Sequence, residues 1–196
     1  MLPATAPAAP PGPELDALLA RIARPAPARV AFVDVRWSGL LARPLVTAGE
    51  LEYRGGEALV KRIDRPYRET TEIDGKDVRV RRAGQTPRRF SLDRAPELRG
   101  MLASFAGLLA GDRKALETYF DVSLDAGDAW TITLVPKAER LRKRVVAIEM
   151  QGRGNTPRCV VVREPDGDAT LSLLGDAGAE AVPRDAAREA LAVRCR

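Results

Sequence analysis

Few residues in this chain have the types and spacing that catalysis requires. None of its 196 residues is a histidine, which excludes Ser-His-Asp and Cys-His arrangements. It also removes the commonest general base and the commonest transition-metal ligand. No other nucleophile–base pair stands out, so an enzyme acting on a lipid or polyketide is disfavoured. The sequence therefore predicts a protein that is not an enzyme, with no catalytic residues, no metal site and no cofactor.

Five aspartates could in principle supply acid–base or calcium chemistry, and they fall mostly at expected turns: Asp34, Asp125, Asp128, Asp166 and Asp168. The segment Asp166-Gly167-Asp168 superficially resembles a calcium loop. It lacks the spaced ligands and the distal glutamate of an EF-hand. We interpret it as a turn.

The two cysteines, Cys159 and Cys195, fit either one disulfide or two buried thiols. Neither has a CxxC partner, which argues against redox catalysis and zinc binding. Cys159 opens an apolar strand and Cys195 lies beside the C-terminus, so a bridge would attach the tail to a sheet. In the chain-entropy description such a bridge stabilises by about 3–4 kcal/mol. We expect the disulfide, which agrees with an oxidising compartment.

Basic residues exceed acidic ones by 32 to 27, giving a net charge of +5. Interspersed acidic residues favour a mixed, solvated surface, with anionic lipid headgroups or nucleic acid as alternatives. A nucleic-acid-binding surface needs aromatic side chains interleaved with its basic residues for base stacking, and none are interleaved with the basic clusters of this chain. The basic residues in question are Arg79, Arg81, Arg82, Arg88, Arg89, Lys137, Arg140, Arg142, Lys143 and Arg144.

Apolar periodicity predicts mostly strands. A first helix over 14–23 carries Leu15, Leu18, Leu19 and Ile22 on one stripe. Gly55-Gly56 and Asp74-Gly75 signal hairpins. Strands are expected at 30–37, 49–53, 58–64, 67–73, 78–82, 129–135, 145–150, 159–163 and 169–174.

The middle of the chain changes to helical spacing over 95–110, which ends at Gly111. Asp112 can cap a second helix over 113–119, and the tail over 183–191 is expected to be helical. A long twisted sheet with such an insertion should curl around it. The sequence therefore predicts an α+β fold, a half-open antiparallel β-barrel with helices forming a lid or plug on the concave face.

One domain is expected over 14–196, after a flexible Pro/Ala-rich lead-in over 1–13. The lead-in lacks the basic and continuous apolar regions of a signal peptide. No run of about 18 apolar residues is present, so no segment is expected to span a membrane.

An ordered series of segments resembles the LolA/LolB family of outer-membrane lipoprotein carriers from about Leu15 to Leu174. The helix-and-strand pair LLAGDRKALETYF and WTITLVPK is its most specific part. The other segments are FVDV, GELEY, ALVKRIDRP, IDGKDV, IEMQG and DGD. Aromatics, at 5% of residues, are fewer than that family's cavity would lead one to expect.

The resemblance implies a monomeric periplasmic carrier, with any leader peptide removed, that holds acyl chains of a lipoprotein, lipid or other hydrophobic envelope molecule. It would pass cargo from an inner-membrane donor toward an outer-membrane acceptor, with transient membrane contact and no nucleic acid. The alternative is a non-enzymatic protein-binding envelope module with a filled core. Arg54 is the nearest candidate for lid control. The expected cavity residues are Leu51, Tyr53, Leu59, Ile63, Ile73, Met101, Phe105, Leu108, Trp130, Ile132, Leu134 and Ile148.

Overall fold

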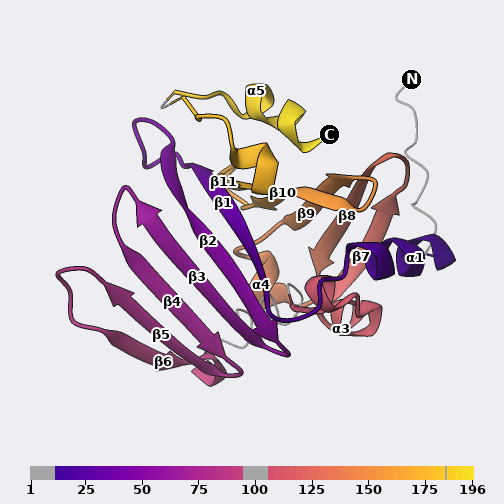
Figure 1. The fold of residues 1–196 in the computed structure, drawn as a ribbon, viewed down its shortest axis with the longest axis horizontal. Helices are drawn as coiled ribbons and strands as arrows, with labels where there is room; N and C mark the ends of the chain where they lie inside the picture. The colour runs from indigo at the N-terminus through magenta and orange to yellow at the C-terminus, as the bar shows by residue number, and fades with distance from the viewer. Residues whose placement is uncertain (1–11, 95–105, 184) are drawn as a thin grey trace.

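The computed structural model describes residues 12–94, 106–183 and 185–196 (Figure 1). Its strands form one antiparallel sheet in the order β6-β5-β4-β3-β2-β1-β11-β10-β9-β8-β7. The strands are β1 (Ala28–Trp37), β2 (Leu45–Gly55), β3 (Ala58–Arg65), β4 (Glu69–Asp74), β5 (Asp77–Arg82), β6 (Arg88–Ser91), β7 (Phe120–Asp125), β8 (Ala129–Pro136), β9 (Ala147–Arg153), β10 (Thr156–Arg163) and β11 (Ala169–Leu174). The helices are α1 (Pro13–Ile22), α3 (Arg113–Tyr119), α4 (Glu139–Arg142) and α5 (Arg188–Ala192), with 3-10 turns η1 (Leu92–Arg94), η2 (Gly175–Gly178) and η3 (Val193–Cys195).

The α+β class and the antiparallel sheet agree with the sequence-based expectation. Among the described residues, β6 and β7 are the two edges of the sheet and do not pair with each other, so the sheet is open and does not close into a barrel. All nine expected strands are present, and β6 and β7 are additional. β6 was missed because its arginines leave Phe90 as its only large apolar residue. β7 was missed because it follows α3 directly, with no Gly or Pro between them.

The register assigns every strand residue to one of two faces, because side chains alternate along a strand and face-mates align across neighbours. Leu51 lies opposite Val30, and the same face continues to Ile132 on β8. We call this side the inner face. The outer face carries Val35, Leu173 and their cross-strand neighbours.

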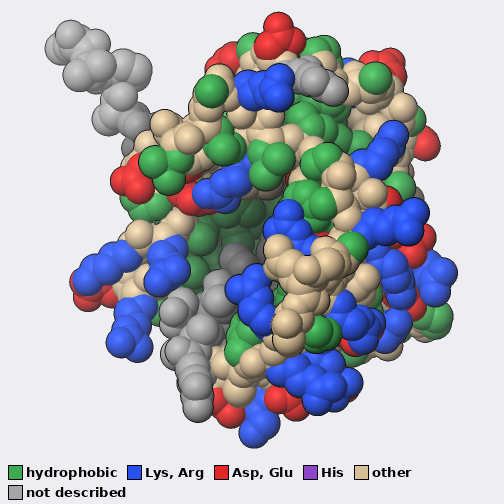
Figure 2. Space-filling model, turned by 90° about the vertical axis from the view of Figure 1, so that its left-hand side faces the viewer, with side chains coloured by type: hydrophobic (Ala, Val, Ile, Leu, Met, Phe, Trp, Pro, Cys, Tyr) green, Lys and Arg blue, Asp and Glu red, His purple; other side chains and the backbone are tan. Residues whose placement is uncertain are grey.

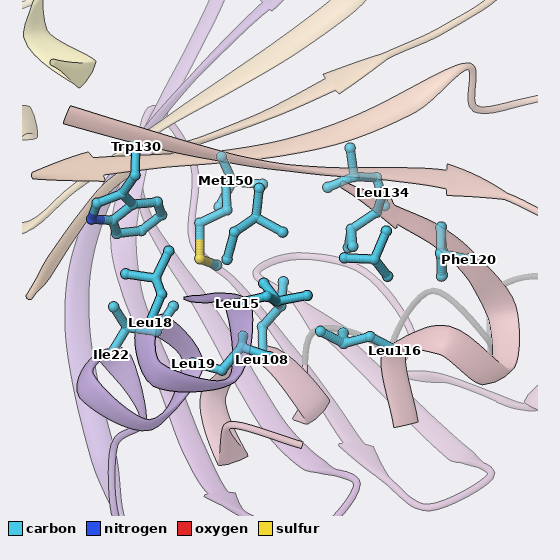
Figure 3. Close-up of a cluster of buried hydrophobic side chains, with 14 of the residues drawn as sticks. Leu15, Leu18, Leu19, Ile22, Leu108, Leu116, Phe120, Trp130, Leu134 and Met150 are labelled. Carbon is cyan, nitrogen blue, oxygen red and sulfur yellow. The ribbon is translucent and has the colours of Figure 1, made fainter. Parts of the chain in front are cut away.

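The main core lies on the inner face of β7–β10, where α1 packs (Figure 3). The apolar stripe of α1 points at Trp130 and Met150, as its spacing predicted. All four leucine and isoleucine side chains of that stripe are buried. Asp112 caps α3 as expected, since its carboxylate accepts a hydrogen bond of 3.2 Å from the backbone N–H of Ala115.

The outer face of β1, β10 and β11 is covered by the C-terminal segment (Figure 1). Cys159 and Cys195 form a disulfide, which resolves the alternative of two free thiols. Both cysteines are buried beside Leu191 in a second apolar cluster. The tail helix is shorter than the expected helix over 183–191. The α-helical part, α5, covers Arg188–Ala192 and continues as the 3-10 turn η3.

Within the described ranges, no helix is long and apolar enough to cross a bilayer. The expected lead-in falls largely on residues 1–11, and most of the expected helix over 95–110 falls on residues 95–105. Both stretches lie outside the described residues. Residues 106–110 are helical, as predicted for the end of that helix.

Candidate ligand-binding cavity

The inner face is packed at two places and hollow between them. α1 covers β7–β10, whereas a smaller cluster around Ile73, Val78 and Leu92 covers β4 and β5. Between these two regions lies a cavity of about 680 Å³ over β1 and β2. Such a volume falls within the range of about 300–1,000 Å³ that small-molecule sites occupy.

Apolar side chains from five parts of the fold line this cavity. Cross-strand neighbours on β1 and β2 contribute Val30, Leu51 and Tyr53, and β11 ends in Leu174. The opposite wall is formed by the last residue of α1 and by the helical segment 106–110. Its apolar members are Ile22 and Leu109.

A backbone contact holds that opposite wall together. The N–H of Arg24 donates to the carbonyl of Leu109 at 2.9 Å, which joins the end of α1 to the end of the 106–110 helix. Gly111 makes this junction sterically possible. Its φ is +71°, in the region that favours glycine, and an added Cβ would lie 3.1 Å from the Leu19 carbonyl oxygen.

Charged residues at the cavity are mostly basic. The lining includes Arg24, Arg29, Arg153 and Arg158, with Asp176 as its carboxylate. Arg29 pairs with Glu52 at 3.3 Å, and Arg153 pairs with Asp128 at 2.6 Å. Viewed from one side, the molecule shows a hollow with hydrophobic side chains at its base and basic side chains along its rim (Figure 2).

A polar pair also lies on the inner face. The ammonium of Lys61 is 2.5 Å from Oδ2 of Asp34 and 4.7 Å from the ring centroid of Phe32. Asp34 is only 6% exposed. Its Oδ1 is buried and has no hydrogen-bond partner within the part of the chain that the structure describes. The Lys61 charge is therefore the main compensation for this carboxylate.

The register places every sheet residue of the expected cavity set on the inner face, but packing separates them into groups. Leu51 and Tyr53 line the cavity. Leu59 and Ile73 belong to the small cluster over β4 and β5, and Ile63 is half-buried outside the lining. The members that fill the main core are Leu108, Trp130, Ile132, Leu134 and Ile148. Met101 and Phe105 lie outside the described residues.

Arg54 lies on the outer face. Its Nε is 3.2 Å from Oε1 of Glu52, while the preceding Tyr53 faces the cavity. Hydrogen bonds from Arg54, then Arg62, and the charge of Arg29 lower the pKa of Glu52 from 4.5 to about 2. Arg54 thus belongs to an ion-pair cluster, and its role in lid control stays a prediction.

The basic residues singled out from the sequence all lie outside the lining of the cavity. Arg81 pairs with Glu72, Arg82 stacks over the ring of Tyr67 at 3.9 Å, and Lys143 pairs with Glu139 at 3.2 Å. These contacts suit a mixed, solvated surface.

The Asp166–Asp168 segment forms the turn expected between β10 and β11, with a hydrogen bond of 2.9 Å from the Glu164 N–H to the Asp168 carbonyl. Bonds from Ser38 and from the Gly39 backbone lower the pKa of Asp168. Among the described residues, no group of three or more His, Cys, Asp or Glu is arranged to hold a metal ion.

Of the lining, sequence reasoning predicted only Leu51 and Tyr53. The residues that it missed include Ile22, Arg24, Leu109, Arg158 and Leu174. Leu174 could have been found, because strand alternation places it with Ser172 on the inner face. Arg24 and Arg158 carry no local signal. They reach the same cavity only through the packing of α1 and the β9–β10 hairpin.

A family model described as outer membrane lipoprotein carrier protein LolA-like matches residues 6–196. No curated protein matches the chain at a significant level.

Among solved structures, the LolA superfamily protein NE2245 from Nitrosomonas europaea is 11% identical, with a TM-score of 0.45 over 84% of this chain and 91% of that one. LprF from Mycobacterium bovis is 14% identical, with a TM-score of 0.39 over 91% and 100%. The MucA/MucB complex from Pseudomonas aeruginosa is 16% identical, with a TM-score of 0.34 over 93% and 62%.

Proposed function

The chain belongs to the LolA-like outer membrane lipoprotein carrier family, and from this premise we propose that it is a periplasmic acyl-chain carrier. Its cargo would be a lipoprotein, a lipid or another hydrophobic molecule of the cell envelope. The acyl chain enters the cavity between the β1–β2 part of the inner face and the end of α1. The loaded protein then delivers its cargo toward the outer membrane.

The single observation that supports this proposal is the apolar cavity over Val30, Leu51 and Tyr53. Each methylene transferred from water to such a surface gains about 0.8 kcal/mol. A cavity of about 680 Å³ offers room for a run of methylenes, so chain length contributes directly to affinity. Because the sheet is open at β6 and β7, cargo can enter without breaking a closed ring of strands.

The lining favours binding over chemistry. Its hydroxyl-bearing residues are Tyr53 and Thr156, and the chain has no histidine to serve as their base. Both cysteines are in the disulfide beneath the C-terminal segment. We therefore assign the cavity to a non-enzymatic carrier.

The test measures how well the wild type and two variants bind lauroyl glycerol, a neutral single-chain lipid. Each variant carries one substitution that introduces a positive charge. Leu51→Arg places a guanidinium in the cavity, whereas the matched control Leu40→Arg alters a side chain that is 95% exposed. We expect at least about tenfold weaker binding for Leu51→Arg, because a charge must be desolvated and an apolar contact is lost. Leu40→Arg should bind as the wild type does. Circular dichroism verifies that both variants fold.

Two results would overturn the proposal: wild-type protein that takes up no acyl probe, or Leu51→Arg that binds as tightly as the control. The first result would favour the alternative role as a protein-binding envelope module. Leu108 is unsuitable for this test. It is 1% exposed within the main core, so an arginine there would report on folding instead of binding.

A further inference from the structure

The cavity lining contains more basic than acidic side chains. Four arginines contribute to it, and Asp176 is the one carboxylate among the described lining residues. Arg29 and Arg153 each have a carboxylate partner, Glu52 and Asp128 respectively. Arg24 and Arg158 differ, because no carboxylate of the described ranges lies within ion-pair distance of either. Two cations at the edge of the cavity, Arg24 and Arg158, therefore have no ion-pair partner among the described residues.

Neutral carbonyl groups hold these two guanidinium groups in place. Arg24 donates to the carbonyls of Ile22 and Ala23 at 3.2 Å, and to that of Asn155 at 3.1 Å. It thereby joins the end of α1 to the β9–β10 turn. Arg158 donates through Nε to the carbonyl of Arg194 at 2.9 Å. Carbonyl partners orient a guanidinium without cancelling its charge.

Both side chains keep donor groups for a further partner. A guanidinium has five N–H donors in a planar fork, and Arg158 uses one of them on Arg194. Such forks match carboxylate and phosphate groups, to which they bond through two parallel N–H groups. Because both side chains are already oriented, binding an anion costs less conformational entropy than ordering free arginines would.

We infer that the cavity takes an amphiphile whose headgroup is anionic, with Arg24 and Arg158 binding the head while the apolar lining binds the chain. This inference rests on the proposed function and adds a substrate class to it. The headgroup is a phosphate or carboxylate carried on the lipid itself. A neutral lipid would use the same chain site and leave both guanidinium groups without an anionic partner.

The test uses two probes that differ only in the headgroup phosphate: lauroyl glycerol and lauroyl glycerol phosphate. Affinities are measured by isothermal titration calorimetry on the full chain, below the concentration at which the probes form micelles. The wild type should bind the phosphate form about tenfold more tightly, the effect of one charge-assisted contact of moderate strength. Raising the salt concentration should reduce this preference, since Arg24 is exposed and its charge is screened.

The double variant Arg24→Gln/Arg158→Gln should lose the preference, so that it binds lauroyl glycerol and lauroyl glycerol phosphate with equal affinity. Arg21→Gln is the matched control, because this exposed arginine of α1 lies outside the cavity lining. It should keep the full preference. The backbone bond from Arg24 to Leu109 and the disulfide next to Arg158 remain in the double variant, and circular dichroism checks its fold.

Each other outcome has a distinct meaning. Equal wild-type affinity for both probes overturns the headgroup inference and leaves the acyl carrier intact. Failure of both probes to bind overturns the proposed function. A preference that survives in the double variant overturns the assignment to Arg24 and Arg158. Inorganic phosphate that binds as well as the phosphate amphiphile, and displaces it, would identify a free-phosphate site instead of a lipid site.

Discussion

The indole ring of Trp130 lies against the backbone of Gly152, its cross-strand neighbour on β9. An added Cβ on Gly152 would be 2.4 Å from Cζ2 of Trp130 and 2.4 Å from the carbonyl oxygen of Thr156. The indole N–H donates to the carbonyl of Gly154 at 2.9 Å. Glycine at this position therefore lets Trp130, which is 3% exposed, close one end of the main core.

Gly152→Ala should destabilise the fold by roughly 1–3 kcal/mol, because the methyl group overpacks a site with no room for it. Gly39→Ala is the control, since an added Cβ there meets nothing within 4 Å. Urea denaturation followed by circular dichroism gives both free energies of unfolding. Equal stability of the two variants would show that Trp130 moves aside without cost.

Lys61→Met should destabilise the fold by about 2–3 kcal/mol, because Asp34 would keep a buried charge without its partner. This figure lies below that for a fully buried pair, since the Lys61 side chain is 38% exposed. Adding Asp34→Leu to Lys61→Met should restore most of the loss, as the charge is then removed. A double-mutant cycle by urea denaturation measures the coupling. Additive effects of the two substitutions would mean that the pair contributes nothing.

Removing the disulfide should lower the free energy of unfolding by about 4 kcal/mol in the chain-entropy description, because the bridge spans 36 residues. The double variant Cys159→Ala/Cys195→Ala is compared with the oxidised wild type by urea denaturation. Wild-type protein under reducing conditions should resemble the double variant. If the variant matches the oxidised wild type instead, the packing of Leu191 and its neighbours suffices to hold the tail.

Glu52 should make the stability of the fold depend on pH in the acid range. Its pKa is lowered from 4.5 to about 2, chiefly by hydrogen bonds from Arg54 and Arg62. The ionised form is therefore favoured in the folded state. Its stabilising contribution is fully present above about pH 4.5 and is lost as the pH falls through about 2.

Glu52→Gln should show a flatter dependence of unfolding free energy on pH between 4.5 and 2 than the wild type does. Asp125→Asn, at an exposed position where β7 ends, is the control and should retain the wild-type slope. Urea denaturation at a series of pH values measures both. The same slope in Glu52→Gln and the wild type would rule out this carboxylate as the source.

The sequence alone determined the faces of the sheet. Leu51 and Tyr53 share a side with Ile132 and Ile148 because side chains alternate along each strand, and the hairpin turns fix how the strands align. The stripe on α1 and the Asp112 cap were likewise predictable, since each depends on spacings of three or four residues. Strand β6 was not predicted, because its sequence is dominated by arginine.

Only the tertiary structure decided which inner-face residues are packed and which line a cavity. Ile132 and Leu51 are both apolar residues of an alternating strand, so the sequence does not distinguish them. In the structure, α1 covers Ile132 in the main core and leaves Leu51 to line the cavity. The docking position of α1 depends on the curvature of the whole sheet, which sums small twists over many strands. Arg24 and Arg158 line the same cavity for the same reason. They are far apart in the chain, and only the packing of α1 against the β9–β10 turn brings their charges to one cavity.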